Sequence, residues 1–186
     1  MASNATIYKA TLQISDMDRQ YYEDHVLTLA RHPSETDERM MMRLLAFVLH
    51  AHEALSFGRG LSAEEEPALW QKDLTGAVEK WIEVGQPEEK TIRRACGRAK
   101  EVYVYTYGGR GADQWWEKNM GTLAKLDNLA VMNLPQDGSH ALASLAQPSM
   151  QLQCTIQEGQ IWMAGEEGNV HIAVTIFKSP SAQHRS

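Results

Sequence analysis

A single carboxylate, Glu83, interrupts the otherwise apolar β-type run at residues 81–84 (Trp-Ile-Glu-Val). Burying a lone ionised carboxylate costs several kcal/mol unless a cation or hydrogen bonds compensate for the lost hydration. A sequence that keeps a glutamate here indicates a need for it, and we expect a metal-dependent phosphodiesterase site. The alternative is a structural glutamate held in an ion pair, because ion-pair networks produce the same pattern.

Further carboxylates are placed to join Glu83. A predicted hairpin pairs its strand with residues 68–71, which puts Glu66, or failing that Glu65, across from it. Glu38, in the first turn of a predicted helix, is a third candidate. Converging carboxylates repel one another unless a divalent cation lies among them, and an oxygen-only set suits magnesium or manganese. The alternative for these three glutamates is an ordinary helix cap or a solvated charge.

The elements that position these residues follow from periodicity and turn signals. We predict strands at 6–15, 68–71, 80–85, 102–107 and 129–134, a short strand or turn at 55–61, three strands within 150–177, and helices from 34–36 to about 55, at 87–100, at 112–126 and at 137–146. A short helix is also expected to begin within the polar stretch 16–24. The order strand, helix, strand implies parallel crossovers. The whole is one α/β domain, a mixed sheet with flanking helices, over residues 1–178, with a disordered tail at 179–186.

Composition limits the possible partners. The 186 residues carry a net charge of −6 at a pI near 5.6, which argues against a surface that coats nucleic acid. Any contact with DNA or RNA must therefore be local. A basic cluster suited to this occurs at Lys90, Arg93, Arg94, Arg98 and Lys100. The alternative is a solvated helix face.

The cysteines and the apolar runs of the sequence indicate the cellular compartment. Cys96 and Cys154 lie far apart and show neither a disulfide framework nor zinc-ligand spacing. The sequence has no apolar leader, and no run approaches the roughly 18 apolar residues that a membrane span requires. We expect a cytoplasmic protein with no membrane partner; the oligomeric state is left open.

Several segments carry a family resemblance: Glu-Glu-Pro-Ala-Leu-Trp at 65–70, Asp-Leu-Thr-Gly at 73–76, Trp-Ile-Glu-Val-Gly-Gln-Pro at 81–87 and Arg-Ala-Cys-Gly-Arg-Ala at 94–99. Residues 32–41 and the pair Trp115-Trp116 support it. Together they resemble the bacterial YaeQ family over nearly the whole chain. That family is similar to a variant of the PD-(D/E)XK (restriction endonuclease-like) core, which implies the order helix, three-stranded meander, helix, strand.

The resemblance also implies roles for particular residues. It assigns metal binding to Glu38 on the helix, to Glu66 or Glu65 at the second strand and to Glu83 at the third. Gly85 occupies the place of the lysine in the nuclease motif, so a substitute is expected in Gln86, Lys90 or Arg94. Two hypotheses follow: a nuclease-like protein that uses magnesium or manganese on DNA or RNA, and a catalytically silent relative that binds nucleic acid or a protein partner.

Overall fold

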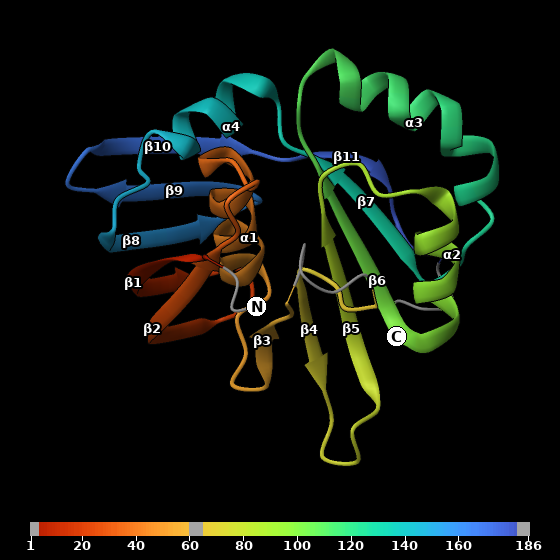
Figure 1. Ribbon diagram of the computed structural model, residues 1–186, viewed down its shortest axis with the longest axis horizontal. Helices are drawn as coiled ribbons and strands as arrows, with labels where there is room; N and C mark the ends of the chain where they lie inside the picture. The colour runs from red at the N-terminus through yellow and green to blue at the C-terminus, as the bar shows by residue number, and fades with distance from the viewer. Residues whose placement is uncertain (1–3, 60–64, 182–186) are drawn as a thin grey trace.

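The computed structural model describes residues 4–59 and 65–181, which form two β-sheets and four α-helices (Figure 1). The five-stranded sheet has the order β10-β9-β8-β1-β2 and consists of β1 (Thr6–Asp16), β2 (Tyr21–Arg31), β8 (Ser149–Gln157), β9 (Gln160–Gly165) and β10 (Gly168–Ala173). The six-stranded sheet has the order β11-β7-β6-β5-β4-β3 and consists of β3 (Leu55–Phe57), β4 (Leu69–Lys72), β5 (Val78–Val84), β6 (Ala99–Thr106), β7 (Leu129–Asn133) and β11 (Thr175–Lys178). The helices are α1 (Asp37–Leu49), α2 (Glu89–Arg98), α3 (Arg110–Leu123) and α4 (Gln136–Ala143).

Both sheets are mixed, where the sequence led us to expect one mixed sheet. In the six-stranded sheet β5, β6 and β7 run parallel, as the predicted crossovers through α2 and α3 require. In the five-stranded sheet β1 pairs in parallel with β8, and β8, β9 and β10 form the predicted antiparallel meander. The expectation of a single sheet was wrong because periodicity identifies strands without showing which strands pair.

Helix α1 lies between the two sheets and fills the space between them (Figure 1). Residues 40–48 of this helix are all buried, as its nearly continuous apolar sequence predicts. On the other side of the six-stranded sheet, α2 and α3 cover a second, smaller apolar cluster that contains Trp81 and Ile92. The six-stranded sheet is therefore the middle layer between α1 and the pair α2 and α3.

The short helix expected within residues 16–24 is absent from the described chain. Asp16 instead begins a turn, in which its carboxylate accepts hydrogen bonds from the backbone and the guanidinium of Arg19. The chain then enters β2, which pairs with β1 at eleven consecutive positions from Tyr21 to Arg31. The polar sequence misled because one face of this strand is exposed, and tertiary pairing overrides local propensity there.

The predicted tail is described only in part. The backbone N–H of Ser181 donates to the carbonyl of Asp127 at 2.9 Å. Residues 182–186, the rest of the predicted tail, lie outside the described residues.

Candidate functional site

The carboxyl ends of the parallel strands β5, β6 and β7 lie at one edge of the six-stranded sheet, and each strand is followed there by a helix (Figure 1). The three connecting loops touch one another. Gln86 donates from Nε2 to the carbonyl of Tyr107 at 3.2 Å, and a Cβ on Gly109 would come within 2.8 Å of Gln136 Oε1. We call residues 85–88, 107–109 and 134–136 the loop edge. Ligands of open α/β sheets commonly bind at such an edge.

Glu83, the penultimate residue of β5, reaches the loop edge. Its Oε1 accepts a hydrogen bond from Trp81 Nε1 at 2.8 Å. Burial raises the pKa of Glu83, while the Trp81 hydrogen bond and the positive charge of Arg39 partly lower it. Neighbouring Ile82 and Val84 pack in the core beside α1, as the predicted strand alternation requires. Within the described chain Glu83 forms no ion pair, so its charge stays largely uncompensated.

Helix α1 brings Glu38 to the neighbouring loop and α4. Glu38 Oε2 accepts a hydrogen bond from Ser139 Oγ at 3.0 Å and lies 3.4 Å from His140 Nε2. The helix begins here because the Thr36 side chain caps it by accepting from the backbone N–H of Arg39. Glu38 is thus held toward α4 by short polar contacts.

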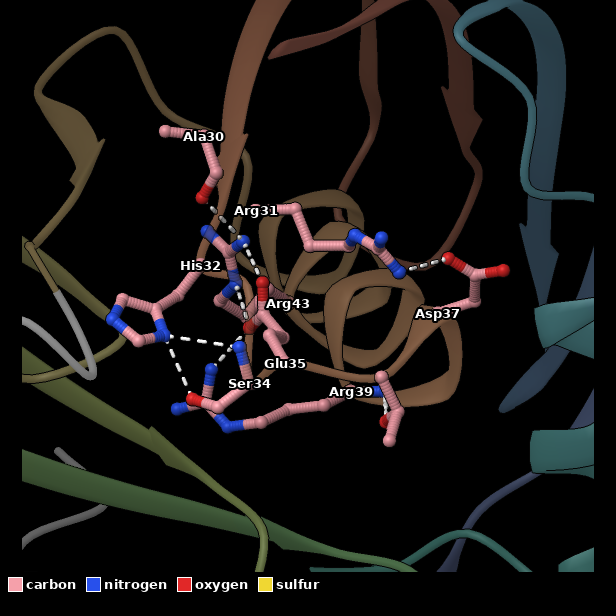
Figure 2. Close-up of polar contacts among 9 residues, drawn as sticks. Ala30, Arg31, His32, Ser34, Glu35, Asp37, Arg39 and Arg43 are labelled. Carbon is pink, nitrogen blue, oxygen red and sulfur yellow. Dashed lines mark hydrogen bonds and ion pairs between the residues drawn. The ribbon is translucent and has the colours of Figure 1, made fainter. Parts of the chain in front are cut away.

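A buried ion cluster anchors the start of α1 (Figure 2). Glu35, whose side chain is 2% exposed, accepts from Arg43 Nε at 2.9 Å and from Arg43 NH2 at 2.6 Å. It also accepts a hydrogen bond from Arg39, whose side chain is 16% exposed. Two guanidinium groups therefore share one carboxylate. Alongside, Arg31 pairs with the more exposed Asp37 at 2.8 Å.

Tyr107 connects this cluster to the loop edge. Burial raises its pKa, and the positive charge of Arg39 acts in the opposite direction. Its side chain forms a hydrogen bond with Thr36, and its carbonyl accepts from Gln86. A continuous path of contacts therefore runs from Arg39 through Thr36 and Tyr107 to the residues that follow β5.

The YaeQ family model matches residues 1–174 of the chain. The chain belongs to the YaeQ family. It is 44% identical to the uncharacterized protein YaeQ of Escherichia coli (strain K12) over 97% of this chain and 100% of that protein, and equally identical, with the same coverage, to that of Salmonella typhi. The crystal structure of YaeQ from Xanthomonas axonopodis pv. citri superposes with a TM-score of 0.92 at 46% identity, covering 95% of this chain and 100% of that one. The crystal structure of YaeQ from Pseudomonas syringae superposes with a TM-score of 0.91 at 36% identity, covering 96% of this chain and 98% of that one.

The predicted YaeQ membership is thus confirmed, as is a mixed α/β fold, here with two mixed sheets and flanking helices. The names of these YaeQ relatives state no activity. Of the described helices, none has the length and apolar character to cross a membrane. The PD-(D/E)XK core and the nuclease activity remain predictions.

Two carboxylates carried over from the YaeQ resemblance lie before β4. The β4–β5 register ends with Leu69 opposite Ile82, so Glu66 falls beyond the paired part of the hairpin. Glu66 Oε2 accepts from the backbone N–H of Arg59 at 2.8 Å and from its Nε at 3.2 Å. These hydrogen bonds lower the pKa of Glu66. Glu65 is exposed.

The structure does not gather the predicted carboxylates of this YaeQ family member around one ion. Among the described residues, no group of three His, Cys, Asp or Glu side chains is placed to hold a metal ion. Glu38 contacts α4, Glu66 contacts Arg59, and Glu83 contacts Trp81. Of the predicted ligands, Glu83 alone combines burial with a charge that has no ionic partner in the described chain.

The predicted substitutes for the motif lysine take different positions. Gly85 has φ +104°, a conformation in which a lysine would be strained, so its lack of a side chain follows from the backbone itself. Gln86 forms part of the loop edge through its bond to Tyr107. Lys90 and Arg94 are exposed on the same side of α2, one turn apart, and form a basic rim rather than part of the loop edge.

Sequence reasoning missed Arg39 and the residues that hold it. The signal was present, because Glu35, Arg39 and Arg43 recur at intervals of four, which places them on one side of a helix and its amino-terminal extension. The second clue was Arg43, the one charged residue in the apolar run 40–49. The contribution of Tyr107 depends on a loop conformation, for which periodicity gives no indication.

Proposed function

We propose that this YaeQ family member is a nuclease-like protein that acts on phosphodiester bonds of nucleic acid with the help of a divalent metal ion. The order of α1, β3, β4, β5, α2 and β6 supports this, because it matches helix, meander, helix and strand in the PD-(D/E)XK resemblance. Glu83 then stands near the end of the third meander strand. The observation that carries the proposal is this half-buried carboxylate, which has a raised pKa and no ionic partner in the described chain, at the loop edge.

The donor set fits a minimal metal site and does not fit a three-carboxylate cage. Magnesium is often held by one or two carboxylates, with water and substrate phosphate completing the shell. Glu83 has one oxygen bonded to Trp81 and a second, Oε2, that accepts no hydrogen bond from the described residues. Glu83 would therefore be the principal ligand. A bound magnesium or manganese ion would neutralise phosphate charge and lower the pKa of a bound water molecule.

The surrounding residues orient this carboxylate and shape the loop edge. Trp81 fixes the position of one Glu83 oxygen through its indole N–H. Gln86 and Tyr107 tie the loop after β5 to the loop after β6. Lys90 and Arg94 add exposed positive charge on α2, where a nucleic acid backbone can lie across them.

A second candidate is a catalytically silent protein that binds nucleic acid or a protein partner. It is favoured by Gly85, whose backbone conformation would strain the motif lysine, and by the contacts of Glu38 with Ser139 and of Glu66 with Arg59. In a catalytically silent protein, Glu83 would contribute to binding of the partner and not to cleavage.

Cleavage assays on single- and double-stranded DNA and RNA, with magnesium, with manganese and with EDTA, separate the two candidates. Glu101→Gln is the matched control for Glu83→Gln, because Glu101 also accepts a hydrogen bond from the aromatic residue two positions away on its strand, Tyr103, at 2.9 Å. Metal-dependent cleavage that Glu83→Gln abolishes and Glu101→Gln leaves intact supports the nuclease-like function. Binding without cleavage in the unmutated protein supports the silent one.

A further inference from the structure

The geometry points to Arg39 as the side chain that receives a phosphate group of the substrate at the loop edge. This inference takes its ligand, a phosphodiester, from the proposed function. It differs from the sequence-based expectation, which placed the cation after β5 in Lys90 or Arg94.

The charge balance of the buried ion cluster leaves one positive charge over. Arg43 uses both oxygens of Glu35, with contacts of 2.6 and 2.9 Å, and donates as well to the carbonyl of Ala30. This pair is nearly fully buried and neutral by itself. Arg39 binds the same carboxylate, so its charge exceeds what Glu35 can neutralise. A cation held in this way is a ready site for an anion.

The guanidinium of Arg39 also keeps most of its donors. A guanidinium carries five N–H groups, and within the described chain Arg39 spends one of them on Glu35. Its side chain is 16% exposed, so part of it reaches solvent. The fork geometry suits two parallel hydrogen bonds to a phosphate group.

The position of Arg39 joins this charge to the candidate site. Figure 2 shows its side chain extending from α1 beneath the loop that carries His32 and Ser34. Its positive charge acts on Glu83, near the end of β5, and on Tyr107, which directly follows β6. The backbone N–H of Arg39 donates to Thr36 Oγ1, and the Thr36 side chain forms a hydrogen bond with Tyr107, so Arg39 lies beside the loop edge.

Anchoring distinguishes Arg39 from the cations of α2. Lys90 and Arg94 are exposed and form no hydrogen bond or ion pair within the described chain, so ordering them costs side-chain entropy. The bond to Glu35 has already restricted Arg39 before any ligand arrives. Phosphate binding by Arg39 thus gains from preorganisation.

The test measures binding of a fluorescent single-stranded oligonucleotide in EDTA, without metal ions, at several salt concentrations. We expect Arg39→Gln to weaken binding about ten- to a hundredfold, and to reduce the slope of log affinity against log salt by about one. Arg94→Gln is the matched control and weakens binding severalfold at most. Arg39→Lys keeps the positive charge and loses the planar guanidinium with its paired donors. The slope of log affinity against log salt therefore stays unchanged, and the affinity falls by less than in Arg39→Gln.

The outcomes separate this inference from the proposed function. Cleavage is measured beside binding on the unmutated protein and on each variant. Loss of binding in Arg39→Gln supports the inference even if the unmutated protein cleaves nothing. Equal affinity of Arg39→Gln and the unmutated protein overturns it, even if the protein proves to be a nuclease. If Arg39→Gln does not fold, Arg39→Lys decides, and affinity equal to that of the unmutated protein overturns the inference.

Discussion

The indole Nε1 of Trp81 donates a hydrogen bond to Glu83 Oε1 at 2.8 Å, between two side chains on the same side of β5. This bond favours the ionised carboxylate, whereas burial favours the protonated one and has the larger effect, so the pKa of Glu83 is raised. A carboxylate whose pKa is raised by burial is more costly to ionise in the folded protein than in water. That cost is expected where function requires the group.

Replacing Glu83 by glutamine is expected to stabilise the protein at neutral pH. The folded state holds the Glu83 proton more tightly than the unfolded chain, where the pKa is about 4.3. Stability from this group is therefore present below the unfolded pKa and is lost as pH rises through the folded pKa. Glu83→Gln removes this loss, and its amide oxygen can still accept the hydrogen bond from Trp81, so we expect a gain in the free energy of unfolding at pH 7 and little change at pH 4. Urea unfolding in EDTA at the two pH values measures this gain in stability, with Glu101→Gln as the control. Equal pH dependence of stability in Glu83→Gln and in the unmutated protein would contradict the prediction.

Removal of the Glu35 charge is expected to be severely destabilising. Glu35→Gln leaves Arg43, with 6% of its side chain exposed, without a counter-charge, and breaking such a buried pair costs about 3–5 kcal/mol. The control is Asp37→Asn in the neighbouring pair with Arg31, where the aspartate side chain is 51% exposed and the expected loss is below about 1 kcal/mol. Chemical denaturation of both variants measures the difference. Similar losses in the two variants would show that the shared carboxylate does not anchor α1.

Acidification is expected to destabilise the protein through His50. Its Nε2 lies 2.6 Å from Tyr105 OH, and burial lowers the pKa of His50 well below its usual value, aided by the positive charges of Lys80 and Arg19. In the unfolded chain His50 takes up a proton near pH 6.5, whereas in the folded protein it stays neutral to a lower pH. Stability is therefore lost as the pH falls through 6.5. Between pH 7.5 and 5.5 the loss is about 1 kcal/mol.

The comparison of His50→Gln with the exposed His52→Gln isolates this effect. Each variant is unfolded by urea at both pH values. The loss on acidification is expected to shrink in His50→Gln and to stay unchanged in His52→Gln. A loss that stays the same in both variants would place the pH dependence elsewhere in the molecule.

Much of the six-stranded sheet was predictable from local sequence. The predicted hairpin, the helix after Pro87 and the following β run correspond to β4, β5, α2 and β6. Alternation along β5 correctly assigned Ile82 and Val84 to the core. These predictions succeeded because the signals involved, periodicity and turn residues, act over a few residues.

Contacts between distant segments were not predictable in the same way. Residues 16–24 contribute to a turn and to β2 because β1 lies beside them, a pairing that their own sequence does not encode. The side chain of Glu38 contacts Ser139, which is 101 positions away in the chain. The carboxylate cluster was therefore a hypothesis about tertiary packing, and among the described residues these carboxylates do not form a group that could hold a metal ion.

Manganese binding, measured by electron paramagnetic resonance of the free ion on the unmutated protein, Glu83→Gln and Glu101→Gln, tests the central claim most directly. A metal-binding carboxylate at the loop edge predicts saturable uptake by the unmutated protein and Glu101→Gln, with affinity reduced about tenfold or more in Glu83→Gln. Equal uptake by all three proteins, or no uptake by the unmutated one, would contradict the claim that Glu83 is the metal ligand of this site.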